Sequence, residues 1–437
     1  MSTPKSFQTE TPGGLISEGT LSKNRMFQEH RLGMFVHWGL YAVRGYHEQE
    51  QQRLSIPRSE YALLADRFAP DAFDPGHWIE RMRAMAGSYL VFTAKHHDGF
   101  CLWNSRRTYF NVTRSSARRD VLLELSLACA REKVPLGIYY SCVDWHDPHY
   151  PNAGRHHELA GPESGDIPDM DRYLETVRAH IEELCGGAYG RFATFWWDMN
   201  VPEYHDPSIN ARIRELQPGI LINNRGYDEG DFSTPERDWG GTLESGADHR
   251  LVEACQSVGS LSWGFKKDED YYTERYLKAS IARHLSAGHN YLLNVGPNAD
   301  GRIPEPAAER LMAIGKWLSN AGKGLIGTQL LDPLPDAPGV LLTRVGDAIY
   351  CFLIGEIPTE GLRLRPIDVA PDEVIDLHTG QTIEWKLDKV PFDAHLDRAF
   401  LRLINIPRPS SDTVTVLRLR FDRNLPAWGR SETSERL

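Results

Sequence analysis

Between residues 33 and 319 the chain alternates short, almost continuously apolar runs with longer amphipathic stretches. Strands that are apolar on both faces and that alternate with amphipathic helices are typical of a parallel sheet. The apolar runs predict strands at residues 33–38, 89–93, 135–140, 192–197, 219–223 and 289–294. The amphipathic stretches predict helices at residues 78–85, 120–132, 171–184, 209–216, 271–286 and 305–319.

An alternation that continues over roughly 300 residues favours closure of the sheet into a barrel. We therefore predict an α/β fold, a (β/α)8-like barrel of the TIM type, as a catalytic domain over residues 1–328. The alternative is a doubly wound open sheet. The GxGxxG motif of dinucleotide-binding folds does not follow the first predicted strand, which disfavours that alternative.

The pattern changes near residue 328, where a Pro-rich connector covers residues 330–339. Short alternating runs separated by turn residues follow this connector, and they predict a C-terminal antiparallel β-sandwich over residues 329–425. These runs cover residues 340–344, 348–354, 361–365, 373–377, 399–403 and 414–419. The remaining residues, 426–437, form a polar tail.

Composition narrows the possible partners. The chain of 437 residues holds 49 Lys and Arg against 60 Asp and Glu, a net charge of −11, which would repel nucleic acid and anionic membranes. The 6 cysteines are widely spaced and form no CxxC pair, so neither a disulfide framework nor a structural zinc site is expected. No apolar leader or spanning segment is visible, so we expect a cytoplasmic protein, with a mature secreted or periplasmic form as the alternative. No pattern specifies an oligomeric state.

Polar side chains gather where the predicted strands end. In a parallel barrel the carboxyl ends of the strands face one pocket, so these side chains are expected to converge on one site. They include His37 and Trp38, the run 95–100 with His96 and His97, Tyr139 and Tyr140, Trp196 to Asp198, Asn223 to Arg225, and Asn294.

Asp198 follows an aromatic run, and its carboxylate suits a nucleophile held ionised by nearby cations. The structural alternatives are a helix cap or an ion pair with Arg225. Glycoside chemistry would need a second carboxylate, for which the pattern offers Glu236, Glu244 and Glu253 without ranking them.

The histidines allow a metal hypothesis, in which three of His37, His96, His97 and His146 bind zinc. Adjacent residues of a strand face opposite ways, however, so His96 and His97 converge only if the chain kinks there. No HExxH or HxH pattern is present, and we predict neither a metal nor a cofactor. Neutral imidazoles beside flat tryptophan faces suit a ligand that carries hydroxyl groups.

Four ordered motifs resemble the α-L-fucosidases of glycoside hydrolase family 29. They are MFVHWGLY at 34–41, TAKHHDGFCLW at 93–103, YYS at 139–141 with DWH at 144–146, and YLLNVGPNADG at 291–301. The resemblance covers about residues 25–328. It implies a somewhat irregular barrel followed by a β-sandwich, and metal-independent release of terminal α-linked L-fucose with retention from fucosylated glycans or oligosaccharides. The alternatives are a metal-dependent hydrolase and a catalytically silent sugar-binding barrel.

The resemblance also implies roles for individual residues. Asp198 resembles the family nucleophile and Glu236 the acid/base. The residues that resemble the sugar-binding set are His37, His96, His97, Tyr139, Arg225 and Trp263, to which we add Trp38 and Trp197. The family has a Glu-Trp pair soon after the first strand. Here Glu48 is our choice for the sugar-binding carboxylate, with Glu50 as its competitor, and Gln stands where the Trp is expected. This departure bears on the rim of the pocket and on linkage preference.

Overall fold

The computed structural model describes residues 29–201, 203–237, 251–326, 328–331, 339–365, 367–389, 399–408, 410–422 and 425. The chain divides into two compact units. The first comprises residues 1–238, 246–271 and 292–308, and the second comprises residues 239–245, 272–291 and 309–437. A domain boundary near residue 328 stays a prediction, and the tail 426–437 lies outside the described residues. No helix of the described residues is long and apolar enough to cross a membrane.

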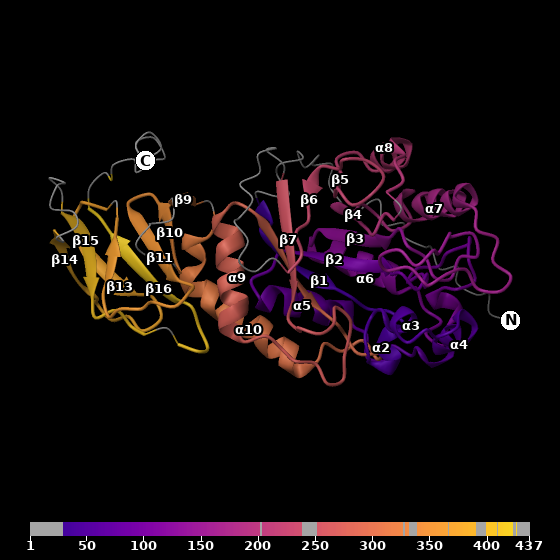
Figure 1. The fold of residues 1–437 in the computed structure, drawn as a ribbon, viewed down its shortest axis with the longest axis horizontal. Coiled ribbons are helices and arrows are strands. Elements are labelled where there is room, and N and C mark those ends of the chain that lie inside the picture. The colour runs from indigo at the N-terminus through magenta and orange to yellow at the C-terminus, as the bar shows by residue number, and fades with distance from the viewer. Residues whose placement is uncertain are drawn as a thin grey trace, which may run out of the picture. The chain divides into compact units, whose positions relative to one another are not determined.

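An 8-stranded parallel sheet forms a nearly closed barrel, as predicted (Figure 1). Its strand order is β5-β4-β3-β2-β1-β8-β7-β6. A bridge between Asn223 and Phe232 joins the two edge strands. The strands are β1 (Leu32–Val36), β2 (Tyr89–Lys95), β3 (Leu136–Ser141), β4 (Thr194–Asp198), β5 (Leu221–Ile222), β6 (Phe232–Ser233), β7 (Leu251–Ser257) and β8 (Asn290–Val295).

The sequence pattern did not predict β6 and β7. β6 is only two residues long, and β7 carries the polar residues Glu253 and Gln256 within its length. Neither segment therefore shows the long apolar run that identifies the other strands. Both are strands because their backbones pair with each other, with Phe232 opposite Leu251 and Ser233 opposite Val252.

The strands alternate with helices whose starts are fixed by side-chain caps. Asp74, Asp120, Asp169 and Asp206 each accept a hydrogen bond from a backbone N–H of the first turn that follows. The helices of the first unit are α2 (Tyr41–Arg44), α3 (Glu50–Arg53), α4 (Arg58–Ala62), α5 (Pro75–Ala84), α6 (Val121–Glu132), α7 (Met170–Cys185) and α8 (Pro207–Leu216). The short helices α2 and α3 lie on either side of the segment 45–49.

Strand parity decides which side chains enter the barrel. Side chains two residues apart lie on the same face of a strand. The barrel core contains Phe35, Tyr89, Val91, Tyr139, Trp196, Leu221, Phe232, Cys255 and Leu292. Asp198 therefore shares the inner face of β4 with Trp196. Trp197 lies on the opposite face, where its indole nitrogen donates to Asn210 of α8.

The second unit contains α9 (Glu274–Ser286), most of α10 (Glu305–Ala321) and two antiparallel sheets that share one apolar core, the predicted β-sandwich. One sheet has the order β13-β16-β11-β10-β9 and the other β12-β15-β14. The strands are β9 (Gln329–Leu331), β10 (Val340–Val345), β11 (Ala348–Leu353), β12 (Leu362–Leu364), β13 (Glu373–Asp376), β14 (Glu384–Asp388), β15 (Phe400–Ile404) and β16 (Thr415–Arg420). Of these, β9 and β14 were not predicted.

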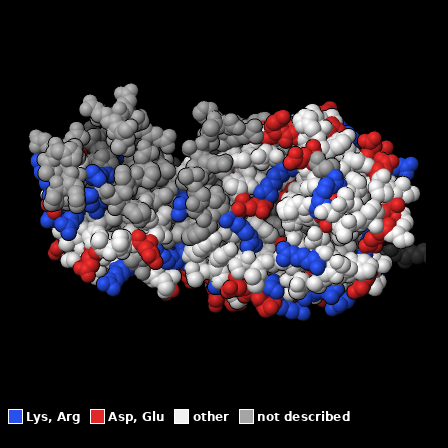
Figure 2. Space-filling view, in the orientation of Figure 1, with Lys and Arg blue, Asp and Glu red and all other residues white. Residues whose placement is uncertain are grey.

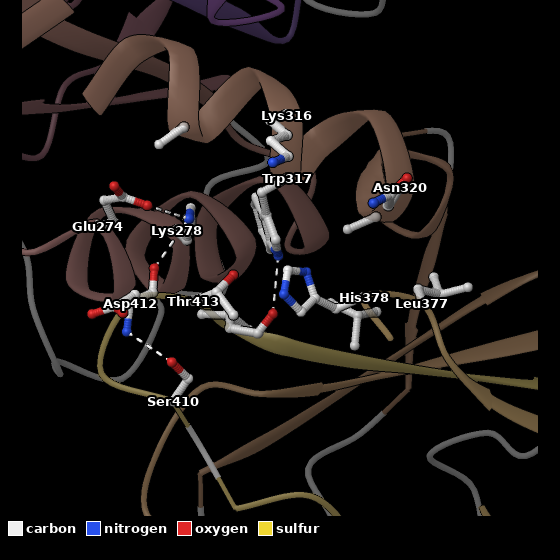
Figure 3. Close-up of a pocket in the computed structure, with 14 residues that line it drawn as sticks. Glu274, Lys278, Lys316, Trp317, Asn320, Leu377, His378, Ser410, Asp412 and Thr413 are labelled. Atoms are coloured by element: carbon white, nitrogen blue, oxygen red, sulfur yellow. Dashed lines mark hydrogen bonds and ion pairs between the residues drawn. The ribbon is translucent and has the colours of Figure 1, made fainter. Parts of the chain in front are cut away.

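A cavity of about 350 Å³ lies in the second unit, beside Trp317 of α10 (Figure 3). The indole nitrogen of Trp317 donates to the carbonyl of Val414. Lys278 donates both to Glu274 and to the carbonyl of Asp412. The buried polar groups of this cavity are thus paired with one another.

Candidate active site

A smaller cavity of about 60 Å³ lies in the first unit, at the carboxyl ends of the barrel strands. Strands β1, β3, β4 and β7 and the segments that follow the strands contribute to its wall. Its lining consists of Phe35, His37, Glu48, Gln49, His96, His97, Tyr139, His157, Trp196, Asp198, Met199, Glu236, Cys255 and Trp263.

On the face of the molecule drawn in Figure 2, acidic and basic side chains lie interspersed rather than gathered by sign.

Asp198 ends β4 and is held by donors on both oxygens. The hydroxyl of Tyr139 donates to Oδ2 at 2.6 Å, and Nη1 of Arg225 donates to Oδ1 at 3.2 Å. Nε2 of His97 lies 4.0 Å from Oδ2. The ion pair with Arg225, which the sequence offered as a structural alternative, therefore exists. Asp198 lines the cavity, whereas Arg225, predicted to bind the sugar, is not among the lining residues.

Glu236 reaches the cavity because the chain continues to pair with β7 after β6 ends. Glu236 forms a parallel bridge with Cys255, and the backbone N–H of Arg237 donates to the carbonyl of Cys255 at 3.0 Å. The side chain of Glu236 is 37% exposed. Nη1 of Arg225, the same atom that binds Asp198, also binds Oε1 of Glu236.

The two carboxyl groups have pKa values that move apart. Burial alone would raise the pKa of Asp198, but Arg225, His97 and the Tyr139 hydroxyl together lower it below its ordinary value. Burial raises the pKa of Glu236, the charge of Asp198 raises it further, and Arg225 opposes the rise only in part. Asp198 therefore loses its proton more readily than Glu236 does, which is the order that a nucleophile and an acid/base require.

Two imidazoles of the cavity have tautomers fixed by their partners. Nδ1 of His37 lies 2.7 Å from Oδ1 of Asn294, whose amide nitrogen donates to Ser257 and to the carbonyl of Trp263. Nδ1 of His97 lies 2.6 Å from Oγ of Ser141, whose proton goes to the carbonyl of Val143. In each ring Nδ1 must therefore donate, and Nε2 is left as an acceptor.

Burial keeps the histidines neutral. It lowers the pKa of His37 to about 4 and that of His97 to about 3, and it lowers the pKa of His96 well below its ordinary value. The pairing of β2 with β3 shifts register between Thr93 and Lys95. Both His96 and His97 line the cavity, which adjacent residues of a regular strand could not do. Nδ1 of His96 is buried without a partner among the described residues.

Glu48, rather than Glu50, lines the cavity. Oε2 of Glu48 accepts from the hydroxyl of Ser262 at 2.6 Å and from the backbone N–H groups of Trp263 and Gly264. Glu50 is fully buried outside the lining, 3.7 Å from Arg44. Trp263 lies beside Glu48 and stacks on His37, with 5.4 Å between the ring centroids.

Two of the expected sugar-binding residues point elsewhere. Trp38 lies on the outer face of the barrel, where its indole nitrogen donates to the carbonyl of Asn298 and its ring packs on Trp78. Trp197 also points outward, toward α8. The prediction of a cavity position is wrong for both. The inward tryptophan of β4 is Trp196, which the sequence named only as part of the aromatic run.

The competing acids occupy other positions. Glu253 is fully buried within the barrel, where it accepts from the Tyr89 hydroxyl at 2.7 Å and from the indole of Trp196 at 3.1 Å. Burial raises its pKa to about 7. It does not line the cavity. Glu244 lies outside the described residues.

Two polar residues of the wall, Gln49 and His157, were not predicted from the sequence. Both line the cavity, and the amide nitrogen of Gln49 donates to Nδ1 of His157 at 2.6 Å. The departure from the family's Glu-Trp pair was a signal for Gln49. His157 lies in the irregular segment between β3 and α7, where no periodicity singles it out.

The described residues contain no group of three or more His, Cys, Asp or Glu side chains arranged to hold a metal ion. His146, one of the four histidines in the metal hypothesis, lies outside the cavity wall and stacks on Phe110 at 3.9 Å. The cysteines are free and buried.

The barrel and its paired carboxylates define a glycoside hydrolase, and comparison with known proteins identifies the family. The family model described as alpha-L-fucosidase matches residues 17–323. The chain is 27% identical over 395 residues to the tissue alpha-L-fucosidase of Bos taurus, covering 83% of this chain and 81% of that protein. It is 28% identical over 359 residues to the alpha-L-fucosidase of Branchiostoma floridae, covering 75% and 78%.

Solved structures agree with this fold. Alpha-L-fucosidase isoenzyme 1 of Paenibacillus thiaminolyticus matches with a TM-score of 0.80 and 28% identity, over 92% of this chain and 100% of that chain. A Bacteroides thetaiotaomicron alpha-L-fucosidase, trapped as a covalent intermediate with 2-fluoro-fucosyl fluoride, matches with a TM-score of 0.74 and 24% identity, over 94% and 99%. The chain belongs to the alpha-L-fucosidase family.

Proposed function

We propose that the protein releases terminal α-L-fucose from fucosylated glycans with retention of configuration, using Asp198 as nucleophile and Glu236 as acid/base. Asp198 forms a bond to the anomeric carbon while the bond from that carbon to the aglycone oxygen breaks, and Glu236 gives its proton to that oxygen. Water then attacks the fucosyl-aspartate, its proton passes to Glu236, and Asp198 leaves as a carboxylate.

The observation that carries this proposal is the contact of one nitrogen of Arg225 with both carboxylates. Because one nitrogen donates both hydrogen bonds, the acceptor oxygens of Asp198 and Glu236 lie within roughly 6 Å of each other. Retaining enzymes place their carboxyl groups about 5–5.5 Å apart, whereas inverting enzymes need about 6.5–9.5 Å. The covalent intermediate of the Bacteroides relative also supports retention.

The rest of the wall suits a deoxy sugar. His37 and His97 present acceptor nitrogens to hydroxyl groups, and Glu48 keeps Oε1 for a further hydroxyl because three donors hold its Oε2. The indole of Trp263 offers an apolar surface to the methyl group of fucose. A hydroxyl at that carbon, as in L-galactose, is expected to weaken binding by about 1–3 kcal/mol.

The first test is Asp198→Asn, assayed with an aryl α-L-fucoside. We expect turnover to be abolished while the circular dichroism spectrum and melting temperature stay close to those of the wild type. For the wild type, proton NMR should detect the α anomer of fucose as the first product. Full activity of Asp198→Asn, or β-fucose as the first product, would refute the proposed mechanism.

The second test is Glu236→Ala, with Glu253→Gln as the matched control. Without the acid, substrates with poor leaving groups should lose more rate than activated aryl fucosides, and azide should restore rate by attacking the fucosyl-enzyme. Glu253→Gln keeps the cavity wall intact and should show no leaving-group dependence. The assignment fails if the control variant shows the dependence and Glu236→Ala does not.

A further inference from the structure

The imidazole of His157 is oriented by a chain of hydrogen bonds that starts at Arg53, an exposed side chain. Nε and Nη2 of Arg53 donate to Oε1 of Gln49 at 3.3 and 3.2 Å. The oxygen of the Gln49 amide must face the guanidinium, because a guanidinium can only donate. The amide nitrogen of Gln49 therefore faces Nδ1 of His157, which lies 2.6 Å away.

This chain gives His157 the opposite tautomer from the other two oriented imidazoles. An amide nitrogen can only donate, so Nδ1 of His157 must accept and the proton of the neutral ring sits on Nε2. His37 and His97, by contrast, donate from Nδ1 and keep Nε2 as an acceptor. Nε2 of His157 has no hydrogen-bond partner among the described residues. The cavity thus combines two imidazole acceptors with one imidazole donor.

The backbone holds His157 at the cavity wall. Its carbonyl accepts from the indole nitrogen of Trp145 at 2.8 Å, and its φ of 61° lies in the left-handed region that non-glycine residues seldom adopt. The His157 ring lies 5.6 Å from that of His97. Strain of this kind persists only where the surrounding contacts enforce it, and it is frequent at binding sites.

The position of His157 indicates which hydroxyl it would meet. Asp198 faces the anomeric carbon in the proposed reaction, and Nε2 of His97 lies 4.0 Å from Asp198. The hydroxyl within reach of His97 is therefore the one next to the anomeric carbon, at C2. His157 contacts both His97 and Gln49, and Gln49 follows Glu48 in the chain. We therefore expect the next hydroxyl of the sugar, at C3, to lie beside His157.

We propose that His157 donates a hydrogen bond from Nε2–H to the 3-hydroxyl oxygen of the fucosyl residue, and that Gln49 is the positioning residue that fixes this tautomer. The inference rests on the proposed function, because the pose is set by attack of Asp198 at the anomeric carbon. In this protein an amide and an imidazole would thus act where the family pattern has a tryptophan.

The first experiment compares His157→Phe with His156→Phe. Phenylalanine keeps a ring but removes the donor, and His156 is an exposed neighbour outside the cavity wall. We expect His157→Phe to lower kcat/KM for an aryl α-L-fucoside roughly tenfold. The loss should appear mainly in KM, because the variant lacks one neutral hydrogen bond to the bound substrate. His156→Phe should match the wild type.

Deoxy substrates locate the contact. The same variants are assayed with the 2-deoxy, 3-deoxy and 4-deoxy forms of the aryl fucoside. The effect of His157→Phe should disappear with the 3-deoxy substrate and persist with the other two, because only the 3-deoxy substrate already lacks the partner. An equal loss with all the substrates would overturn the proposal.

The role of Gln49 is tested by the tautomer itself. Imidazole nitrogen-15 spectra of the wild-type protein should show His157 protonated at Nε2 and His37 and His97 protonated at Nδ1. Gln49→Leu should convert His157 to a mixture of tautomers and leave the other two rings unchanged. A wild-type His157 protonated at Nδ1, or a His157 signal unaffected by Gln49→Leu, would contradict the positioning role.

These outcomes are separable from the proposed function. If Asp198→Asn stays active, the mechanism fails, whereas the tautomer spectra still test Gln49. If Asp198→Asn is inactive and the wild type hydrolyses the aryl fucoside, loss of the 3-deoxy signature contradicts only the role given to His157.

Discussion

Of the two cavities described above, the larger has its buried polar groups paired, whereas the smaller contains the reactive ones. The cavity beside Trp317 measures about 350 Å³, and its buried polar groups bind one another. The barrel cavity measures about 60 Å³, yet two carboxylates with divergent pKa values, an arginine contact and four histidines converge on it. Chemistry follows from ionisable groups that are buried together and left with unused hydrogen-bonding capacity, and cavity volume alone does not indicate it.

Two buried lysines, Lys95 in the first unit and Lys278 in the second, offer the strongest test of this comparison. Lys95 is fully buried and binds Asp144, itself 6% exposed, at 2.9 Å. Lys278 binds Glu274, which is 39% exposed. We expect Lys95→Met to lower the free energy of unfolding by about 3–5 kcal/mol, because it strands a buried charge. Lys278→Met should lower the free energy of unfolding by about 1 kcal/mol or less, because the partly exposed Glu274 stays hydrated.

Urea denaturation of both variants measures this difference, and equal costs would contradict it. Burial alone would raise the pKa of Asp144, but Lys95 and hydrogen bonds lower it in the folded protein. The stability that this group contributes is therefore present above its unfolded pKa, about 3.9, and is lost as the pH falls through the lower folded value. The cost of Lys95→Met should accordingly shrink in acid.

Arg225, which contacts both Asp198 and Glu236, offers a test of activity at the barrel cavity. We expect Arg225→Gln to lower kcat/KM by roughly 10²–10³, the usual effect of removing one preorganised donor from a reacting group. The wild-type rate should fall in acid as Asp198 takes up a proton and fall in alkali as Glu236 loses one. Loss of the arginine charge raises both pKa values, so both limbs of the pH–rate profile should move to higher pH. A pH profile that does not move would contradict the bridging role.

The smallest change in stability and activity is expected from a substitution in the cavity beside Trp317. Trp317→Phe removes the hydrogen bond to Val414, which should lower the free energy of unfolding by about 1 kcal/mol and leave kcat/KM unchanged. Thermal unfolding and the aryl fucoside assay measure the two quantities. Loss of activity in the folded variant would mean that this cavity also contributes to catalysis.

Most of the barrel could be predicted because six of its strands lie within apolar runs of the sequence. The six apolar runs correspond to β1, β2, β3, β4, β5 and β8. β6 and β7 could not be predicted, since β6 lies in no apolar run and β7 carries Glu253. Both become strands only through their neighbours. The site was predictable as a set of strand ends, and Asp198, Glu236, His37, His96 and His97 do meet there.

The errors in the site share one cause. A strand that is apolar on both faces does not reveal which face turns inward. Trp38 and Trp197 were therefore given cavity positions, although only their neighbours on the inner face, His37 and Trp196, line the cavity. His157 was missed because its role depends on Gln49, 108 residues away in the chain.

Local sequence patterns predicted most of the strands and helices and the candidate reacting side chains, because periodicity and residue chemistry are local properties. Three features became evident only in the folded chain: which tryptophan faces the cavity, which glutamate approaches Asp198, and which nitrogen of His37, His97 and His157 carries the proton. Those choices depend on strand parity, on a shared arginine and on hydrogen-bond partners from distant segments, and such contacts exist only once the barrel has closed.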